Sequence, residues 1–133
     1  MQMKLNNKNR KIAHQALIQA YHRYKSNKEL CFKIFLQGLN SPDSFIRRAT
    51  VALIYLNPWQ EKDKIHLLEK AAIIEIKKTK EPQSENQKFN LQQNLFYLYR
   101  LGSPAIPALK RLFNKLTTQK NKQSIINYIK NIK

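Results

Sequence analysis

The chain has 133 residues, of which 42% are hydrophobic, so it is long and apolar enough for one domain with a hydrophobic core. It contains only two glycines, which excludes glycine-rich phosphate loops, the dinucleotide fingerprint and the nucleophile elbow, because each of these needs glycine for close backbone approach or a positive φ. The formal net charge is +17, and such an excess attracts nucleic acid, an anionic membrane or an acidic protein.

The apolar pattern predicts an all-α chain of seven helices joined by short connections. Over roughly 8–25, apolar residues recur every three or four positions, which is typical of a helix with one buried face. Ser26 and Glu29 have the spacing of a capping box, so a second helix is expected over roughly 27–40.

A third helix is expected over roughly 42–57, with Ser41 as its N-cap and Pro42 at its first position. Its predicted buried stripe consists of Phe45, Ile46, Ala49, Ala52, Leu53 and Leu56. Because further apolar residues lie on its other side, this helix is expected to be central.

The remaining helices are expected over roughly 58–78, 85–101, from 103 onward and over 119–132. Asn57-Pro58 opens the first of these, and Ser84 with Gln87 forms a second capping box. Gly102 can end a helix in the left-handed conformation. Helices of these lengths with short connections become antiparallel neighbours.

The segment from 39 to 56 reads LNSPDSFIRRATVALIYL, in which a Leu and a Pro-Asp turn precede an apolar residue, Arg, and spaced Ala and Leu. This pattern resembles the end of a HEAT repeat, and LGSPAIPALKRL, from 101 to 112, is similar to the start of another. The matching residues are Pro42, Asp43, Ile46, Arg47, Ala49, Leu53 and Leu56. The resemblance implies a single HEAT-like domain over 1–133, a short right-handed α-solenoid of about three antiparallel helix pairs.

The basic residues gather at the two ends of the chain. Residues 1–28 carry seven Lys and Arg, residues 86–133 carry nine, and neither segment contains an acid. The HEAT resemblance places the first, third, fifth and seventh helices on the concave side, which makes that side the more basic one. The alternative is that the charge reflects a genome biased towards Lys, Asn and Ile.

Two functions are consistent with these features. The first is a non-enzymatic protein–protein interaction module, a small adaptor or inhibitor that presents a basic concave face to an acidic partner. The alternative is a nucleic-acid-binding protein that grips phosphates through the first and last helices. No cofactor, catalytic residue or metal ligand is assigned, and the oligomeric state stays open. The residues expected to contact the partner or phosphate are Lys8, Lys11, Lys25, Arg47, Arg48, Arg100, Lys120, Lys122 and Lys130.

Asp43 and Arg47 form the most specific local motif in the sequence. In HEAT-like proteins such residues stabilise the turn, and we expect the same role here. The segment SPDSFIRRA also resembles part of the bacterial HEAT-like alkylpurine DNA glycosylases, whose aspartate assists loss of a cationic base. Arg100 matches that family's DNA-backbone arginine very loosely. Leu39 stands where the family has a tryptophan, which argues against this activity.

The other residues with chemical potential do not form a recognisable site. His14, His22 and His66 do not converge by spacing, and with one cysteine there is no zinc signature. Cys31 is expected to be a core thiol, which fits a reducing, cytoplasmic location. Trp59 is expected to pack at a repeat junction, with an exposed anchor as the alternative.

No apolar run approaches the ~18 residues of a membrane span, so no transmembrane segment is expected. The N-terminal stretch lacks the apolar segment of a secretory signal. Residues 8–25 are basic and amphipathic, as in a transit peptide, but a first structural helix explains this pattern equally well.

Overall fold

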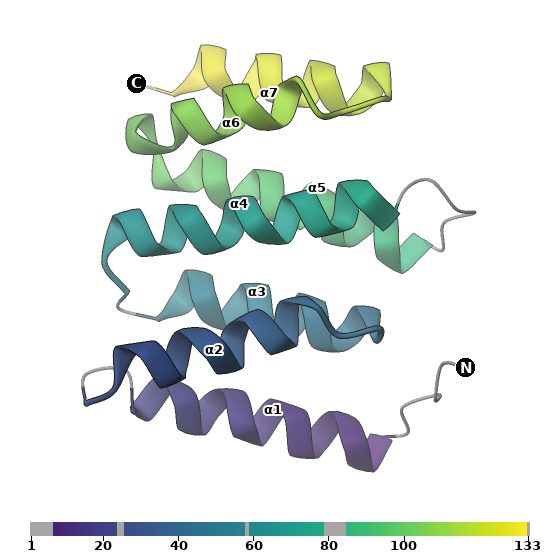
Figure 1. The fold of residues 1–133 in the computed structure, drawn as a ribbon. Helices are drawn as coiled ribbons and strands as arrows, with labels where there is room; N and C mark the ends of the chain where they lie inside the picture. Colours follow the sequence, from purple (N-terminus) through teal and green to yellow (C-terminus); the bar gives the residue numbers. More distant parts are fainter. Residues whose placement is uncertain (1–6, 24–25, 58, 79–84, 133) are drawn as a thin grey trace. The chain divides into compact units, whose positions relative to one another are not determined.

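The structure, a computed structural model, describes residues 7–23, 26–57, 59–78 and 85–132. These residues form seven α-helices and one short 3₁₀ helix and contain no strand, so the all-α class is confirmed for them (Figure 1). The chain divides into two compact units, Met1–Trp59 and Gln60–Lys133.

The first unit contains α1 (Asn7–His22), α2 (Lys28–Leu39) and α3 (Ser44–Leu56), and each helix packs on the other two (Figure 1). Its buried apolar side chains are Leu17, Ala20, Cys31, Phe35, Leu39, Ile46, Val51, Ile54 and Trp59. Removal of this apolar surface from water is the main stabilising contribution to the unit, because each large side chain contributes about 1.5–3 kcal/mol.

The N-cap of α2 is Asn27 rather than Ser26. The Asn27 Oδ1 accepts a hydrogen bond from the N–H of Leu30 at 3.1 Å, whereas the Ser26 hydroxyl donates to the carbonyl oxygen of Arg23. The capping box predicted from Ser26 and Glu29 is therefore wrong. Asn caps a helix at least as well as Ser does, and here Ser26 is used by the end of the preceding helix.

The N-cap of α3 is Asp43, two residues beyond the predicted cap. Its Oδ1 accepts a hydrogen bond from the N–H of Phe45 at 2.9 Å, and its own N–H donates to the hydroxyl of Ser41 at 3.1 Å. Ser41 therefore caps the turn before the helix, and the prediction that it caps α3 is wrong. A carboxylate is the stronger cap at this end because it also interacts favourably with the helix dipole.

The buried face of α3 also differs from the predicted stripe, since Phe45 is 42% exposed and Leu56 is 72% exposed. The side chains that α3 buries are Ile46, Arg47, Thr50, Val51 and Ile54. The prediction assigned the face by hydropathy alone. It failed because Thr50 satisfies its hydroxyl within the helix, donating to the carbonyl oxygen of Ile46 at 2.7 Å.

A glycine sets the close approach of α2 and α3. A Cβ added at Gly38 would overlap the hydroxyl oxygen of Thr50 and would lie 3.0 Å from its Cγ2. The same Cβ would lie 3.3 Å from Cδ2 of Leu17 on α1. Gly38 therefore provides the space in which all three helices of the first unit meet.

Trp59 is buried at the end of the first unit. Its ring centroid lies 5.1 Å from that of Phe32 and 5.2 Å from that of Phe35, both on α2. Trp59 is therefore a packing residue and not the exposed anchor considered as an alternative. Asn57-Pro58 was predicted to open the next helix, but α4 begins at Glu61 and Asn57 is the C-cap of α3, so that prediction is wrong; Pro58 itself lies outside the described residues.

The second unit contains α4 (Glu61–Lys78), α5 (Glu85–Leu101), η1 (Ser103–Ala105), α6 (Ile106–Phe113) and α7 (Gln119–Asn131). Here α4 packs on α5 and α6, and α7 also packs on α5 and α6 (Figure 1). Its buried apolar side chains are Leu67, Leu68, Ala71, Ala72, Leu91, Leu95, Leu98, Ala105, Ala108, Leu109, Leu112, Leu116 and Ile125.

The chain reverses between α5 and α6 at Gly102, which has a φ of 84°. The positive φ favours glycine because a Cβ is strained there, but the ψ of −153° is far from the left-handed helical value of about +47°, so the predicted left-handed C-cap is wrong. The sixth helix starts as a 3₁₀ turn with Pro104 and continues as α6, whose first turn contains Pro107. The capping box predicted at Ser84 lies outside the described residues.

Candidate functional site

Three charged side chains and one aromatic ring form a cluster where α1 meets the start of α3. The Arg10 Nε donates to Asp43 Oδ2 at 2.6 Å. The Arg10 guanidinium carbon lies 4.5 Å from the centroid of the Phe45 ring, and the guanidinium carbon of Arg48 lies 5.2 Å from it. Asp43 therefore orients Arg10, and Phe45 gathers two guanidinium groups through cation–π attraction.

An open groove with a volume of about 280 Å³ lies beside this cluster, between α1 and α3. The residues that line it are Arg10, Lys11, His14, Leu17, Phe45, Ile46 and Ala49. Leu17 and Ile46 are buried and give the groove an aliphatic base, whereas Lys11 and His14 are exposed. Among the described residues, no carboxylate lines the groove, which is apolar with a basic rim.

The residues predicted to contact a partner fall into distinct environments. Lys11 and Arg48 belong to the groove and its aromatic cluster, respectively. Arg100 is exposed on α5, in the second unit. Lys25 lies outside the described residues, and so does the side chain of Lys8.

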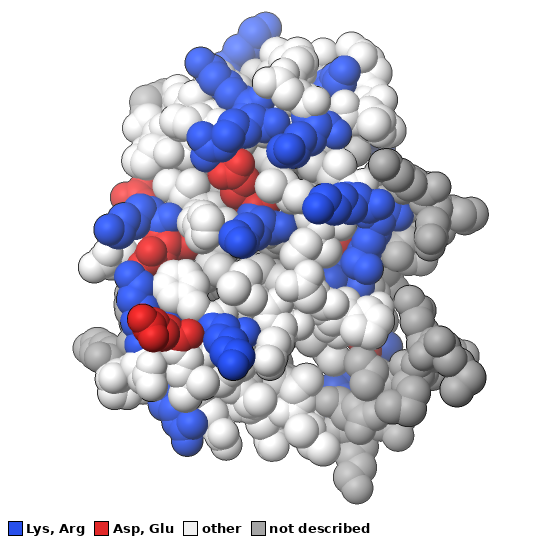
Figure 2. All heavy atoms as spheres, viewed as in Figure 1, with Lys and Arg blue, Asp and Glu red and all other residues white. Residues whose placement is uncertain are grey.

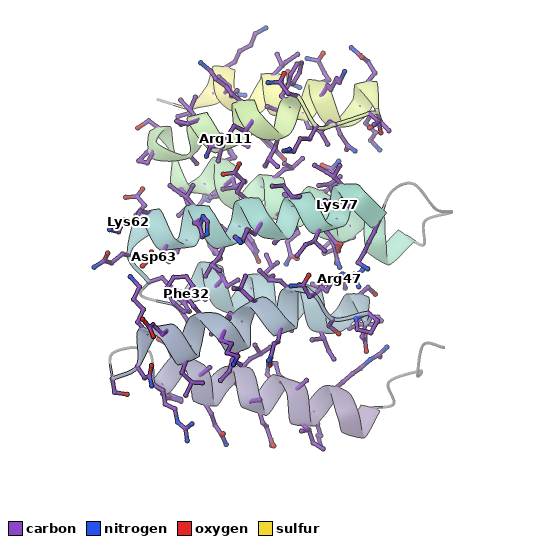
Figure 3. The ribbon with its side chains drawn as sticks, in the orientation of Figure 1. Phe32, Arg47, Lys62, Asp63, Lys77 and Arg111 are labelled. Atoms are coloured by element: carbon purple, nitrogen blue, oxygen red, sulfur yellow. The ribbon has the colours of Figure 1, made fainter. Side chains whose placement is uncertain are left out.

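Arg47, labelled in Figure 3, does not lie on the surface. Its side chain is 3% exposed, and its Nη1 donates to the carbonyl oxygen of Ser41 at 2.8 Å. The prediction that Arg47 contacts a partner or phosphate is therefore contradicted by its burial. The same contact fits the other role considered for this residue, which is to brace the turn before α3.

Both carboxylate oxygens of Asp43 are used within the first unit. One accepts the hydrogen bond from Phe45 that caps α3, and the other accepts the hydrogen bond from Arg10. The side chain is 5% exposed. These contacts explain Asp43 as the residue that fixes α3 against α1.

Three predicted lysines lie on α7, a helix that contains no acidic residue. Lys120 and Lys130 are exposed, and Lys122 is half-buried with its Nζ 5.7 Å from the centroid of the Phe113 ring. Figure 2 shows basic side chains at the top of the view, where α6 and α7 lie. This surface is polar and positively charged.

Two acidic residues on α4, Glu69 and Glu75, form hydrogen bonds or ion pairs with other helices of the second unit. Arg111 forms a two-point ion pair with Glu69, with N···O distances of 2.8 Å and 2.7 Å, which joins α6 to α4 (Figure 3). Glu75 is buried, and its Oε1 accepts from the side-chain amide of Asn90 at 3.1 Å. These carboxylates therefore stabilise helix contacts and do little to neutralise α7.

The sequence also raised the questions of a metal site and of a reactive cysteine. Within the residues that the structure describes, no three His, Cys, Asp or Glu side chains are placed to hold a metal ion. Cys31 is buried, its Sγ–H donates to the carbonyl oxygen of Ala20 at 2.8 Å, and burial raises the pKa of the thiol to about 11. None of the described helices combines the length and the hydropathy that a bilayer crossing requires.

Sequence reasoning missed Arg10, His14 and Phe45 as a group. Phe45 was assigned to the buried stripe, and Arg10 was counted only as part of the charge of the first helix. The sequence contained one usable signal, because Phe45 directly precedes Ile46 and two arginines at the start of a helix. The pairing of Arg10 with Asp43, 33 positions apart, had no local signal.

Comparisons of the chain with protein-family models, with curated proteins and with solved structures found no match.

Proposed function

We propose that the chain is a non-enzymatic protein–protein interaction module with HEAT-like helix pairs, a small adaptor or inhibitor that binds an acidic protein. The observation that carries this proposal is the distribution of charge. The α1, α3 and α7 helices contain basic residues and no Asp or Glu, whereas four acidic residues lie on α4. Surfaces of one sign attract a partner of the opposite sign and raise its association rate.

The helix contacts support the HEAT-like part of the proposal. In the second unit, α4 packs on α5 and α6, and α7 packs on α5 and α6. In a HEAT-like stack, α4 with α5 and α6 with α7 are successive pairs, so alternate helices also contact each other. The right-handed solenoid with a basic concave face follows from this proposal as an expectation.

The non-enzymatic part is supported by the engagement of Asp43. An aspartate that assists base loss must face a substrate, whereas both oxygens of this carboxylate bond to groups of the first unit. Its position favours the structural role over the glycosylase reading.

A nucleic-acid-binding function is the alternative, and one feature favours it. Lys120, Gln123, Asn127 and Lys130 are all exposed on α7. Their spacing places them on one face of the helix, where Lys side chains could bind phosphates and the amides could bond to sugar or phosphate oxygens.

The two functions are distinguished by capture from a lysate of the source organism, with and without nuclease. The immobilised chain should retain the same proteins in both arms. Capture should fall when Lys120, Lys122 and Lys130 are changed to Gln. The matched control changes Lys62, Lys70 and Lys77 of α4 to Gln, which removes the same charge from exposed positions on a helix that also carries acids. Loss of all captured proteins on nuclease treatment would contradict the proposal.

A further inference from the structure

We propose that the groove between α1 and α3 is the docking site for an acidic peptide segment of the partner, in which an apolar side chain is flanked by Asp or Glu. The inference rests on the proposed function and assigns to it a place and a ligand chemistry. It is carried by the groove of about 280 Å³ and by the Arg10, Phe45 and Arg48 cluster at its edge.

The apolar base of the groove favours a ligand that inserts an apolar side chain, here called its anchor. Leu17, Ile46 and Ala49 offer aliphatic surface, so a group that enters the groove is stabilised by apolar contact. The volume lies near the lower end of the range for small-molecule pockets, roughly 300–1,000 Å³, and suits one or two large apolar side chains. A leucine, phenylalanine or tryptophan of a peptide fits this requirement.

The basic residues at the rim favour acidic residues on either side of the apolar anchor of the ligand. Arg10 uses its Nε–H for Asp43, and its terminal nitrogens have no hydrogen-bond partner among the described residues. Lys11 is exposed on the same rim. Carboxylates on either side of the anchor would therefore find donors, and Arg can bind a carboxylate through two N–H groups.

Asp43 makes this arrangement specific for an acidic ligand. It is the carboxylate beside the groove, but its oxygens are committed to Arg10 and to the N–H of Phe45. It therefore holds the guanidinium over the ring and leaves the outer donors of Arg10 for the ligand. Prior orientation of a long side chain lowers the entropic cost of binding.

The observations favour a peptide over a nucleic-acid base. A base that entered the groove would bring polar edges against Leu17, Ile46 and Ala49, whose side chains offer no hydrogen bonds. Two guanidinium groups also lie over the Phe45 ring, which leaves less of its surface for a base to stack on.

The test begins with selection from a display library of random peptides of about twelve residues, with the intact wild-type chain as the target. The selected peptides should contain an apolar residue flanked by Asp or Glu. A fluorescein-labelled consensus peptide should bind with a Kd tighter than about 100 μM at about 150 mM salt, and replacement of its acids by Asn and Gln should abolish binding.

Variants then locate the site. Phe45→Ala and Arg10→Gln should each weaken the consensus peptide at least about tenfold. Ala49→Leu, which fills the groove without changing charge, should do the same. The matched controls are Phe96→Ala, because Phe96 is 44% exposed in the second unit, and Arg23→Gln, because Arg23 is exposed beyond the end of α1. Both controls should bind as the wild type does, and circular dichroism should show that every variant is folded.

The outcomes separate the docking site from the proposed function. Suppose that acidic peptides bind Phe45→Ala and Ala49→Leu as tightly as the wild type, but bind less tightly when Lys120, Lys122 and Lys130 become Gln. This result would show that the groove is not the docking site, and it would leave the proposed interaction module intact. Selection of basic or uncharged peptides, or of no peptide, would contradict both the docking site in the groove and the proposed acidic partner. If an oligonucleotide binds at the same salt concentration and its affinity depends on Phe45, the ligand of the groove is nucleic acid rather than a peptide.

Discussion

Arg10 and Asp43 join the first helix to the start of the third through a contact of 2.6 Å between Nε and Oδ2. The same carboxylate caps α3 through its other oxygen, which accepts from the N–H of Phe45. One side chain therefore performs two structural tasks, and it places a guanidinium over the aromatic ring at the edge of the groove. Both the stability of the first unit and the shape of its candidate site depend on this pair.

Replacement of Asp43 should distinguish its two tasks. Asp43→Ala removes the cap and the ion pair, and we expect it to lower the free energy of unfolding by about 1–3 kcal/mol. Asp43→Asn keeps an oxygen that can cap α3, so its cost should be smaller. Urea unfolding measures both values, and equal losses would show that the cap contributes little.

The same variant also tests the non-enzymatic proposal. Neither wild type nor Asp43→Asn should release a methylated purine from alkylated DNA. Release by the wild type that disappears in Asp43→Asn would overturn the proposal, provided that circular dichroism shows the variant to be folded.

The burial of α3 predicts opposite results at two aliphatic positions. Ile54 is fully buried, so Ile54→Ala should cost about 2–5 kcal/mol, because it removes packed methyl groups and leaves a cavity. Leu56 is exposed, and Leu56→Ala should change stability by about 0.5 kcal/mol or less. Similar losses at the two positions, measured by denaturant unfolding, would mean that the face of α3 is wrongly assigned.

Gly38→Ala should destabilise the first unit although alanine is the better helix former. The new methyl group collides with Thr50, and we expect a net cost of about 1–3 kcal/mol. Thr50→Ala removes the colliding atoms, so the double variant should be more stable than the sum of the single losses implies. Strict additivity in this double-mutant cycle would show that the close approach does not limit the substitution.

Cys31 should contribute to stability in a pH-dependent way. Burial raises the pKa of its thiol from 9.0 to about 11, so the folded chain retains the proton more tightly than the unfolded chain. This contribution is complete below pH 9 and is lost as the pH rises towards about 11. Between these values, thermal or urea unfolding should show a larger loss of stability for the wild type than for Cys31→Ala.

The comparison with Cys31→Ala is needed because another group titrates in the same direction. Burial and the nearby charge of Tyr99 raise the pKa of Tyr128, but this effect is common to both proteins and cancels in the difference. Parallel stability profiles for wild type and variant would contradict the assignment to Cys31.

Helix positions were predictable because hydropathy with a period of three to four residues is a local property. The predicted range 85–101 coincides with α5, and the predicted range 119–132 exceeds α7 by one residue. The positive φ of Gly102 was also predictable, since glycine adopts it without steric cost, whereas its ψ of −153° was not. These features depend on neighbours in the sequence.

The helix faces and the candidate site were less predictable because they depend on tertiary contacts. Arg47 and Thr50 are polar but buried, and their burial requires acceptors that only the folded chain supplies. Phe45 is apolar but 42% exposed, and the group that covers part of its ring is Arg10, from another helix. A residue's hydropathy does not contain this information.

The affinity of the intact chain for nucleic acid at about 150 mM salt tests the central claim most directly. Fluorescence anisotropy with labelled duplex DNA and single-stranded RNA should give dissociation constants weaker than about 100 μM for both, as expected when the basic surface binds an acidic protein. The opposite result would be tighter binding with a log–log salt slope near −4 to −5, reduced by about 2–3 units when Lys120, Lys122 and Lys130 become Gln. That result would show that these lysines bind phosphates, and it would contradict the account.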